Sequence, residues 1–330
     1  MCFYTGNVHF AEHAQPMILL GVCSMASGRG ACETIRLFVQ RLAIYGERGV
    51  GPWVKRRCQM LLCPVCGKEL LEDEHGAHCA AGHRFDRARE GYLYLLCSSK
   101  SGDSMGDPKA QARSRRDFLN RSYYAPLRDA MVGLARERAA ACAAAGEAPL
   151  HLLDICCGEG YYTSAMGAVP GVEAYGFDLG KEMVRLAAKR GGASYFVANM
   201  KAIPVADGAF DMVTHLFAPF NEREFARVLA PEGSLFTVVP GARHLFGLKE
   251  VLYDTPYLND EKLPQTELLE LVDTRKVTAQ IELVCQEDIE AVFQMTPYYY
   301  RTRPADRERL AGLDTLKTDI EFVIAEYRHC

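Results

Sequence analysis

From residue 150 onward, short apolar runs alternate with segments whose apolar residues recur at helical spacing. "LHLLDICC" predicts a buried strand that enters the turn "GEG", and "YYTSAMGAV" after it has the pattern of a helix. Further strands are predicted at "EAYGFD", "SYFVA", "FDMVTHLF" and "GSLFTVV", and helices at "GKEMVRLAAKR" and "EREFARVL". The tail adds two strand patterns, "DTRKVTAQIEL" and "DIEFVIAEYRH". Strands separated by helices predict a Rossmann-like α/β domain with a mostly parallel sheet over residues 146–330.

The part of the chain before this domain divides into three segments. Residues 1–59 mix short apolar runs with Gly-rich breaks, and Met60 stands directly before "LLCPVC". We expect 1–59 to be a disordered leader or an upstream extension of a chain that begins at Met60. The alternative is an accessory helix, because "TIRLFVQRLAIYG" has helical spacing. Residues 60–98 form a Cys/His-rich module, and 99–145 a Gly/Ser/Asp/Pro loop followed by basic helices.

Charge is distributed unevenly along the 330 residues, although the net charge is only −4. Residues 55–128 hold 14 Lys and Arg against 9 Asp and Glu, whereas residues 129–330 hold 20 against 30. This excludes a wholly basic nucleic-acid binder and predicts a polyanion-facing surface on the first part alone. The odd number of 13 cysteines favours free thiols and a metal site in a reducing cytoplasm. No apolar run has the roughly 18 residues of a membrane span.

The segment "CPVCGKELLEDEHGAHCAAGH" (63–83) contains two pairs of metal-ligand residues. They are Cys63 and Cys66, two residues apart in a Cys-x2-Cys turn, and Cys79 and His83 in a Cys-x3-His turn. Four such ligands on two tight turns suit a tetrahedral zinc ion, and a site filled by four protein ligands is structural rather than catalytic. His75 and His78 are rival ligands. Coincidental thiols in a Cys-rich chain are the alternative to zinc.

The turn in "LLDICCGEGYYTSA" (152–165) predicts a nucleotide site. An acid on a parallel strand followed by Gly-x-Gly lets the backbone approach a ligand at the carboxyl edge of the sheet. Asp178 ends the next strand, where its carboxylate can accept hydrogen bonds from both hydroxyls of a ribose. Asp-x-x-x-Gly-x-Gly at this spacing is the S-adenosylmethionine version of the turn. Cys156 occupies its first glycine position, which leaves the tightness of the turn there open.

Together these features resemble the bacterial 23S rRNA guanine-N1 methyltransferases, which include macrolide-resistance enzymes. The resemblance covers about residues 60–304. Its segments are "CPVCGKEL", "CAAGHRFDRAREGYLYLL", "GDSMGDPKAQARSRRDFL", "YYAPLRDA", "LDICCGEGYYT", "LFAPF", "VVPGARHLFGLKE" and "QMTPYYYR". It implies a class I S-adenosylmethionine-dependent methyltransferase with a zinc module, acting as a homodimer on a 23S rRNA hairpin in the cytoplasm. The methyl-donor contacts that it implies are Tyr124, Gly158, Glu159 and His244, to which the fold logic adds Asp178. The family has glycine at position 156.

Several further residues are candidates for RNA binding and catalysis. The basic helix supplies four candidate phosphate contacts, namely Arg113, Arg115, Arg116 and Arg121. Guanine N1 carries a proton that must be removed. His215, Glu222 and His244 lie on or after predicted strand ends, but the sequence identifies none of them as the base. In "LFAPF" (216–220), Phe217 and Phe220 are candidates for stacking on a flipped base, and "YYY" (298–300) offers another such surface.

Two other functions fit parts of this sequence. The acidic C-terminal body and the generic nucleotide turn also suit a small-molecule methyltransferase. Alternatively, Cys156 in the glycine turn would fit a zinc protein that binds RNA without catalysis. Transfer of a labelled methyl group to RNA separates the first interpretation from both.

Overall fold

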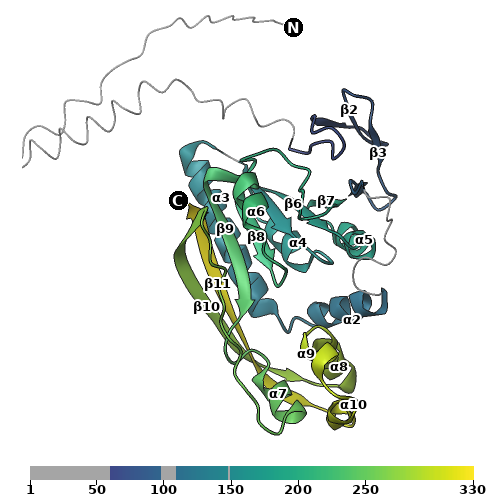
Figure 1. The fold of residues 1–330 in the computed structure, drawn as a ribbon, viewed down its shortest axis with the longest axis vertical. Helices are drawn as coiled ribbons and strands as arrows, with labels where there is room; N and C mark the ends of the chain where they lie inside the picture. Colours follow the sequence, from purple (N-terminus) through teal and green to yellow (C-terminus); the bar gives the residue numbers. More distant parts are fainter. Residues whose placement is uncertain (1–59, 98–108, 148) are drawn as a thin grey trace, which may run out of the picture. The chain divides into compact units, whose positions relative to one another are not determined.

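The computed structural model describes residues 60–97, 109–147 and 149–330, so the predicted leader (1–59) lies outside the described residues. Within the compact unit that holds them, an eight-stranded sheet runs in the order β10-β11-β9-β8-β5-β6-β7-β4 (Figure 1). Strand order reverses between β5 and β8, because the chain moves from β5 outward to β7 and then returns to the other side. In open α/β sheets, ligands bind beside such a reversal at the carboxyl ends of the strands.

Six strands of this sheet are parallel to one another. They are β4 (Leu93–Tyr94), β5 (Leu150–Ile155), β6 (Val172–Asp178), β7 (Ser194–Val197), β8 (Phe210–Leu216) and β9 (Leu229–Pro240). Every residue of β5 is buried, as expected for a central parallel strand with both faces covered. The predicted α/β architecture is therefore confirmed, and five of these strands coincide with strand patterns in the sequence.

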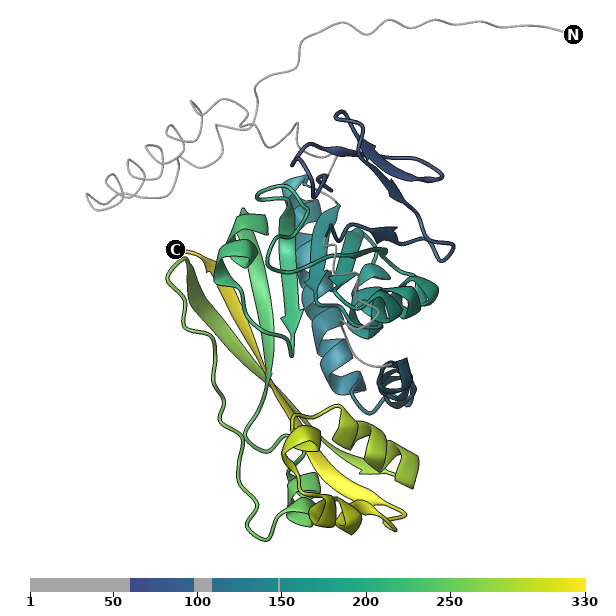
Figure 2. The same ribbon diagram turned by 45° about the vertical axis from the view of Figure 1, so that its right-hand side comes forward.

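The two predicted C-terminal strands form a long antiparallel hairpin at one edge of the sheet. β11 (Leu316–His329) pairs with β9 on one side and with β10 (Leu269–Leu283) on the other. Three helices follow β10 in sequence, and Figures 1 and 2 place them with the helix after β9 around one end of the hairpin. These helices are α7 (Phe246–Leu252), α8 (Gln286–Gln294), α9 (Tyr298–Arg301) and α10 (Pro304–Arg307), and the 3-10 turn η2 (Glu308–Leu310) follows them.

The remaining described helices lie in sequence between the parallel strands of the large sheet. They are α2 (Lys109–Asn120), α3 (Ala125–Ala145), α4 (Tyr161–Gly167), α5 (Lys181–Arg190) and α6 (Glu222–Val228). Apolar residues of α3 and α4 pack in one core with Leu152 and Met212, on one face of the sheet. Phe225 of α6 packs in a second core with Leu153 and Val213, on the other face. The alternation along β5 and β8 divides the two cores.

The Cys/His-rich module is built on a small antiparallel sheet. Its strands are β1 (Leu70–Glu72), β2 (Gly76–Cys79) and β3 (Arg84–Asp86). Met60, Leu61 and Leu70 are buried in the same core as Phe210 and Phe225 of the larger domain. The module also supplies β4, which pairs in parallel with β7 at the edge of the large sheet. It is therefore continuous with the sheet rather than joined to it by a flexible tether.

Candidate functional site

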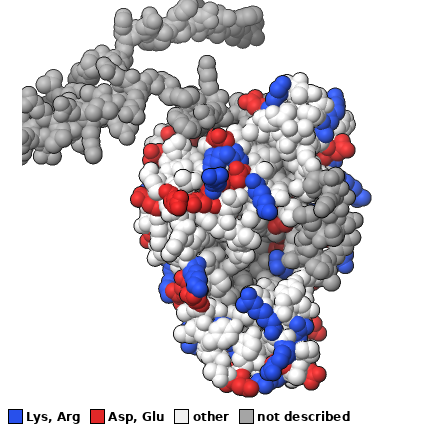
Figure 3. Space-filling view, in the orientation of Figure 1, with Lys and Arg blue, Asp and Glu red and all other residues white. Residues whose placement is uncertain are grey.

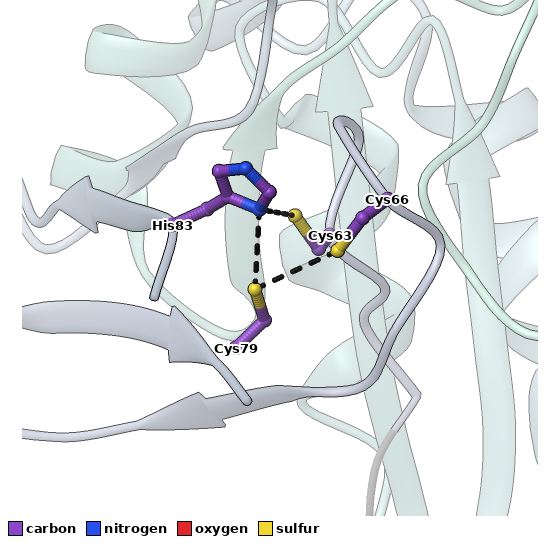
Figure 4. Close-up of side chains that lie close together, drawn as sticks. All are labelled: Cys63, Cys66, Cys79 and His83. Atoms are coloured by element: carbon purple, nitrogen blue, oxygen red, sulfur yellow. Dashed lines mark hydrogen bonds between the residues drawn. The ribbon is translucent and has the colours of Figure 1, made fainter. Parts of the chain in front are cut away.

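Two backbone turns, each closed by a glycine amide, bring the four predicted metal ligands together (Figure 4). In the first, the Gly67 amide donates to the carbonyl of Cys63 (2.8 Å), and in the second the Gly82 amide donates to the carbonyl of Cys79 (2.9 Å). Both glycines have positive φ, +70° and +86°, a conformation that glycine adopts at little cost. The turns leave one ligand atom each from Cys63, Cys66, Cys79 and His83 within 4.8 Å of one another.

The spacing of these atoms fits a tetrahedral zinc ion. Zn–S bonds of about 2.3 Å and a Zn–N bond of about 2.0 Å separate two sulfurs by about 3.8 Å, and sulfur from nitrogen by about 3.5 Å. The Sγ atoms of Cys66 and Cys79 are 3.7 Å apart. His83 Nδ1 lies 3.5 Å from Cys63 Sγ and 3.4 Å from Cys79 Sγ. Burial raises the pKa of Cys79, but hydrogen bonds from the amides of Ala81 and His83 lower it to about 6, which favours the thiolate that binds a metal.

The glycine turn between β5 and α4 is formed by three residues with positive φ. These are Cys156 (+57°), Gly158 (+56°) and Gly160 (+80°). The first position of the turn therefore carries a side chain, although the backbone there has a conformation that favours glycine. The Cys156 thiol lies 3.7 Å from the sulfur of Met200. Burial raises the pKa of Cys156 to about 12, so the thiol is protonated at neutral pH.

Two acids anchor this turn. Asp178, at the end of β6, accepts hydrogen bonds from the Gly158 amide (3.1 Å) and the Gly180 amide (2.8 Å) through different oxygens. These two amides hold the carboxylate at the carboxyl end of β6, the position from which the sequence predicts contact with a ribose. Asp154 is buried in β5 and accepts hydrogen bonds from the hydroxyls of Thr163 and Thr214. Burial raises the pKa of Asp154 to about 6.

Glu159 follows the glycine turn and is almost completely buried. Arg190 of α5 donates to its Oε2 through Nε (3.1 Å) and Nη2, and Nη2 also donates to Asn120 at the end of α2 (2.9 Å). Burial raises the pKa of Glu159 despite this ion pair. Glu159 Oε1 and the Tyr162 hydroxyl are two of the six buried side-chain atoms among the described residues that have no hydrogen-bond partner. A ligand that carries an ammonium group, such as S-adenosylmethionine, fits the unsatisfied carboxylate oxygen.

Tyr124 and His244 meet from distant parts of the sequence. The Tyr124 hydroxyl lies 3.2 Å from His244 Nε2, and the Glu321 amide donates to His244 Nδ1 (3.4 Å). With Nδ1 accepting, the ring hydrogen is on Nε2 and points to the tyrosine oxygen, so the hydroxyl hydrogen of Tyr124 can be donated to a ligand. Burial, with the charge of Lys249 as a second cause, lowers the pKa of His244 to about 3. His244 is therefore neutral at pH 7.

Lys249 of α7 is a buried cation that the sequence patterns did not single out. Its side chain has 0% exposure, and its ammonium donates to the Tyr257 carbonyl (2.8 Å) and to Asn259 Oδ1 (2.7 Å). The ammonium also lies 4.1 Å and 5.2 Å from the ring centres of Tyr257 and Tyr298. Burial lowers the pKa of Lys249. Nothing in the sequence around Lys249, "LFGLKE", indicates that the charge of this lysine would be buried.

The other sequence candidates are placed as follows. Arg113, Arg115 and Arg116 lie on α2, and the charges of Arg115 and Arg116 help to stabilise the Glu159 carboxylate. Arg121 forms an ion pair with the buried Asp288 (2.7 Å). His215 is buried with Nε2 3.1 Å from the carbonyl of Pro219, and burial lowers its pKa to about 4.

Glu222 lies away from the residues around the glycine turn and binds a backbone segment. Its Oε1 accepts hydrogen bonds from the amides of Glu267 (2.5 Å) and Leu268 (2.6 Å). These contacts give Glu222 a structural role at the start of α6.

Both parts of the chain match known families. Residues 61–100 match a zinc-ribbon family described as "RlmA, N-terminal", and residues 152–233 match a methyltransferase domain. The chain is 33% identical over 201 residues to the 23S rRNA (guanine(748)-N(1))-methyltransferase of Streptomyces fradiae, covering 60% of this chain and 69% of that one. A candidate 23S rRNA (guanine-N1)-methyltransferase of Micromonospora griseorubida is 32% identical, covering 58% and 69%. Another, YxjB of Bacillus subtilis, is 30% identical over 287 residues, covering 80% and 96%.

This chain belongs to the 23S rRNA (guanine-N1)-methyltransferase family. The family's methyltransferase domain uses S-adenosylmethionine as the methyl donor, and its zinc ribbon holds a structural zinc ion, for which the four clustered ligands fit. None of the described helices is both long enough and apolar enough to cross a membrane. In this structure the glycine turn follows the carboxyl end of β5 and His244 follows that of β9, on the edge where α/β sheets bind ligands.

Proposed function

We propose that this protein transfers the methyl group of S-adenosylmethionine to N1 of a guanine in a 23S rRNA hairpin loop. The observation that carries the proposal is a relative that spans both the zinc ribbon and the methyltransferase domain, over 80% of this chain. A methyltransferase domain alone occurs with many substrates, whereas the relatives named as rRNA enzymes match 58–80% of this chain.

Bound S-adenosylmethionine supplies an electrophilic methyl group. The chain's contribution is to hold and orient the reactants. We assign Gly158, Glu159 and Asp178 to the donor's amino and ribose groups, and the Tyr124 hydroxyl, oriented by His244, to a further donor contact. Because His244 is neutral and already uses both ring nitrogens, we assign it to orientation rather than to removal of the guanine proton.

Two surfaces are candidates for the RNA backbone. The exposed Arg113 and its neighbours on α2 form the first. The second lies near α9 and α10, where Arg301, Arg303 and Arg309 are exposed and Figure 3 shows basic side chains on the part of the molecule that holds these helices. Residue counts averaged over 129–330 conceal this second group, because acidic residues elsewhere outweigh it. Clustered arginines attract phosphates independently of base sequence.

Three finer features complete the proposal. The family resemblance supports a homodimer whose zinc ribbons border an RNA cleft, which light scattering at several concentrations would test. Action on ribosomal RNA supports a cytoplasmic location, which cell fractionation would test. Macrolide resistance would be measured as the drug concentration that inhibits cells with and without the gene.

The central experiment uses the intact chain and a 23S rRNA transcript that carries no modifications. Tritium from labelled S-adenosylmethionine should enter the RNA, and reverse transcription should stop beside one guanine, because N1 methylation blocks base pairing. Label in small metabolites but not in RNA would instead indicate a small-molecule methyltransferase. RNA binding without donor binding or methyl transfer would indicate an RNA-binding protein without catalysis.

A pair of tyrosine variants tests the donor site without removing a ring. Tyr124→Phe loses only the hydroxyl, so the KM for S-adenosylmethionine should rise about tenfold, as loss of one hydrogen bond to a charged group predicts. Tyr327→Phe is the matched control, because its buried hydroxyl donates to the Pro264 carbonyl on the other face of the sheet. An unchanged KM in Tyr124→Phe, or the same rise in both variants, would remove Tyr124 from the donor site.

A further inference from the structure

Strained backbone is concentrated at the carboxyl ends of three adjacent strands. Among the described residues other than glycine, Cys156, Phe217 and Leu245 have φ values of +57°, +57° and +56°, and Ser122 is the fourth with positive φ. Cys156 follows β5, Phe217 follows β8, and Leu245 lies between β9 and α7. Side chains rarely adopt this conformation, and strained residues of this kind cluster at functional sites.

Phe217 differs from the other two because its side chain is exposed. It is 46% exposed, although its amide donates to the Val238 carbonyl (3.3 Å) in the sheet. The centre of its ring lies 5.6 Å from the centre of the Phe322 ring. Phe322 in turn contacts the ring of His244 (4.6 Å) and that of Tyr124 (5.1 Å). Phe217 is therefore the exposed end of a row of rings that leads to the proposed donor contacts.

Phe220 has a different environment, three residues along the same loop. Its ring lies between 5.0 and 6.4 Å from the rings of Phe225, His215 and Tyr327, all of which are buried. These contacts belong to the core on the opposite face of the sheet from Phe322. The two phenylalanines that the sequence leaves equivalent thus differ: Phe220 is half-buried against a core, and Phe217 is exposed.

We propose that Phe217 is the platform on which the target guanine stacks during methyl transfer, and that its strained backbone holds the ring outward for this purpose. The inference rests on the proposed function, because it names the residue that binds the base. Enzymes that modify unpaired bases hold them against aromatic rings. A ring without a polar group positions the plane of guanine while leaving its N1 edge available for the reaction.

Replacement by glycine separates a role in binding from a role in stability. Phe217→Gly removes the ring and also the strain, since glycine adopts positive φ readily. We expect its melting temperature to equal or exceed that of the native chain, while kcat/KM for the RNA falls about 10- to 100-fold, the cost of one lost stacking contact. The KM for S-adenosylmethionine should change less than threefold. A lower melting temperature with proportionate loss of activity would overturn the proposal.

Phe220→Leu is the matched control. It removes a ring from the buried cluster, so it should lower the melting temperature and leave kcat/KM per folded molecule within about threefold of the native value. If instead Phe220→Leu loses RNA turnover and Phe217→Gly keeps it, Phe217 is not the platform and the proposal is wrong.

A fluorescence experiment tests stacking without relying on turnover. Trp53 is the only tryptophan in the chain, so Phe217→Trp in a Trp53→Phe background reports on one site. A hairpin transcript of the target loop should quench this tryptophan, whereas S-adenosylhomocysteine alone should leave most of its emission. Emission that the hairpin does not change, although filter binding shows the hairpin bound, would refute stacking.

The outcomes also separate this inference from the proposed function and from a contact between two copies of the chain. If the native chain transfers no methyl group to 23S rRNA, the proposed function fails, whatever the fluorescence shows. If it does transfer and Phe217→Gly is as active as the native chain, only the platform fails. If Phe217→Gly changes the oligomeric state in light scattering, the ring is an interface residue and the platform is rejected.

Discussion

The buried carboxyl group of Asp154 should make the stability of the fold depend on pH. Asp154 lies in the central strand β5 with 2% exposure, and its partners are the hydroxyls of Thr163 and Thr214. Neither partner is charged. Burial raises the pKa of Asp154 to about 6 from an ordinary value of 3.8. The variant Asp154→Asn keeps the size of the side chain and removes the charge, and its amide can still form one hydrogen bond with each hydroxyl.

The magnitude follows from the difference between the two pKa values. A difference of about two pH units corresponds to about 3 kcal/mol when the group is ionised in both states. Below the unfolded pKa both states are protonated and no penalty exists. As the pH rises, the unfolded chain ionises first, so the free energy of unfolding falls until the folded carboxyl ionises too. About 2 kcal/mol of this loss should lie between about pH 4.5 and pH 8.

Urea unfolding of the native chain and of Asp154→Asn across this pH range provides the measurement. The difference in free energy of unfolding, variant minus native, should increase by about 2 kcal/mol from the acidic to the alkaline end. Using the change with pH removes any constant effect of the substitution. Asp314→Asn, on an exposed bend, is the control for the removal of one surface carboxyl. If the Asp154→Asn difference is flat, the carboxyl is not held protonated by burial and this reasoning is wrong.

Three further predictions follow from the site. Cys66→Ser should lose zinc in elemental analysis and lower the melting temperature by on the order of 10 °C, whereas Cys97→Ser, an exposed thiol outside the cluster, should do neither. Lys249→Met should raise the pKa of His244 in NMR titration, because the lysine charge opposes its protonation, and should cost about 2 kcal/mol through two unsatisfied acceptors. Cys156→Gly should stabilise the chain by about 1 kcal/mol in urea unfolding by relieving positive φ; a loss of stability would show that the thiol's contacts outweigh the strain.

The large-scale fold was predictable because its signals are local. A run such as "LHLLDICC" is long enough and apolar enough to be a buried strand in any context, and the helical segments between such runs require parallel pairing. The zinc ligands were predictable for the same reason, since each pair needs only one tight turn. The predicted donor contacts Tyr124 and His244 came from family resemblance, because their meeting depends on the path of the whole sheet.

Other features had no local signal. β4 is only two residues long, and its place beside β7 depends on where the zinc ribbon packs. Likewise, nothing in "LFAPF" separates Phe217 from Phe220, because both are single aromatic residues beside a strand end. The two residues differ only in the folded chain. Phe217 has positive φ and lies beside Phe322, whereas Phe220 packs against the core on the other face of the sheet.

The zinc ribbon packs against the methyltransferase domain and contributes to its core and its sheet. The Leu62 amide donates to the Pro204 carbonyl (2.8 Å), and the Met60 carbonyl accepts from the Ala206 amide (3.0 Å). The ribbon therefore begins with a short antiparallel bridge to the segment before β8. Because β8 ends at Leu216, directly before Phe217, the ribbon supports one end of the strand whose other end carries the proposed base platform. Loss of zinc should therefore disturb RNA turnover through β8 as well as through any direct contact of the ribbon with RNA. Removal of residues 60–97 would likewise take a strand and core residues from the methyltransferase sheet, so it should reduce stability as well as RNA turnover.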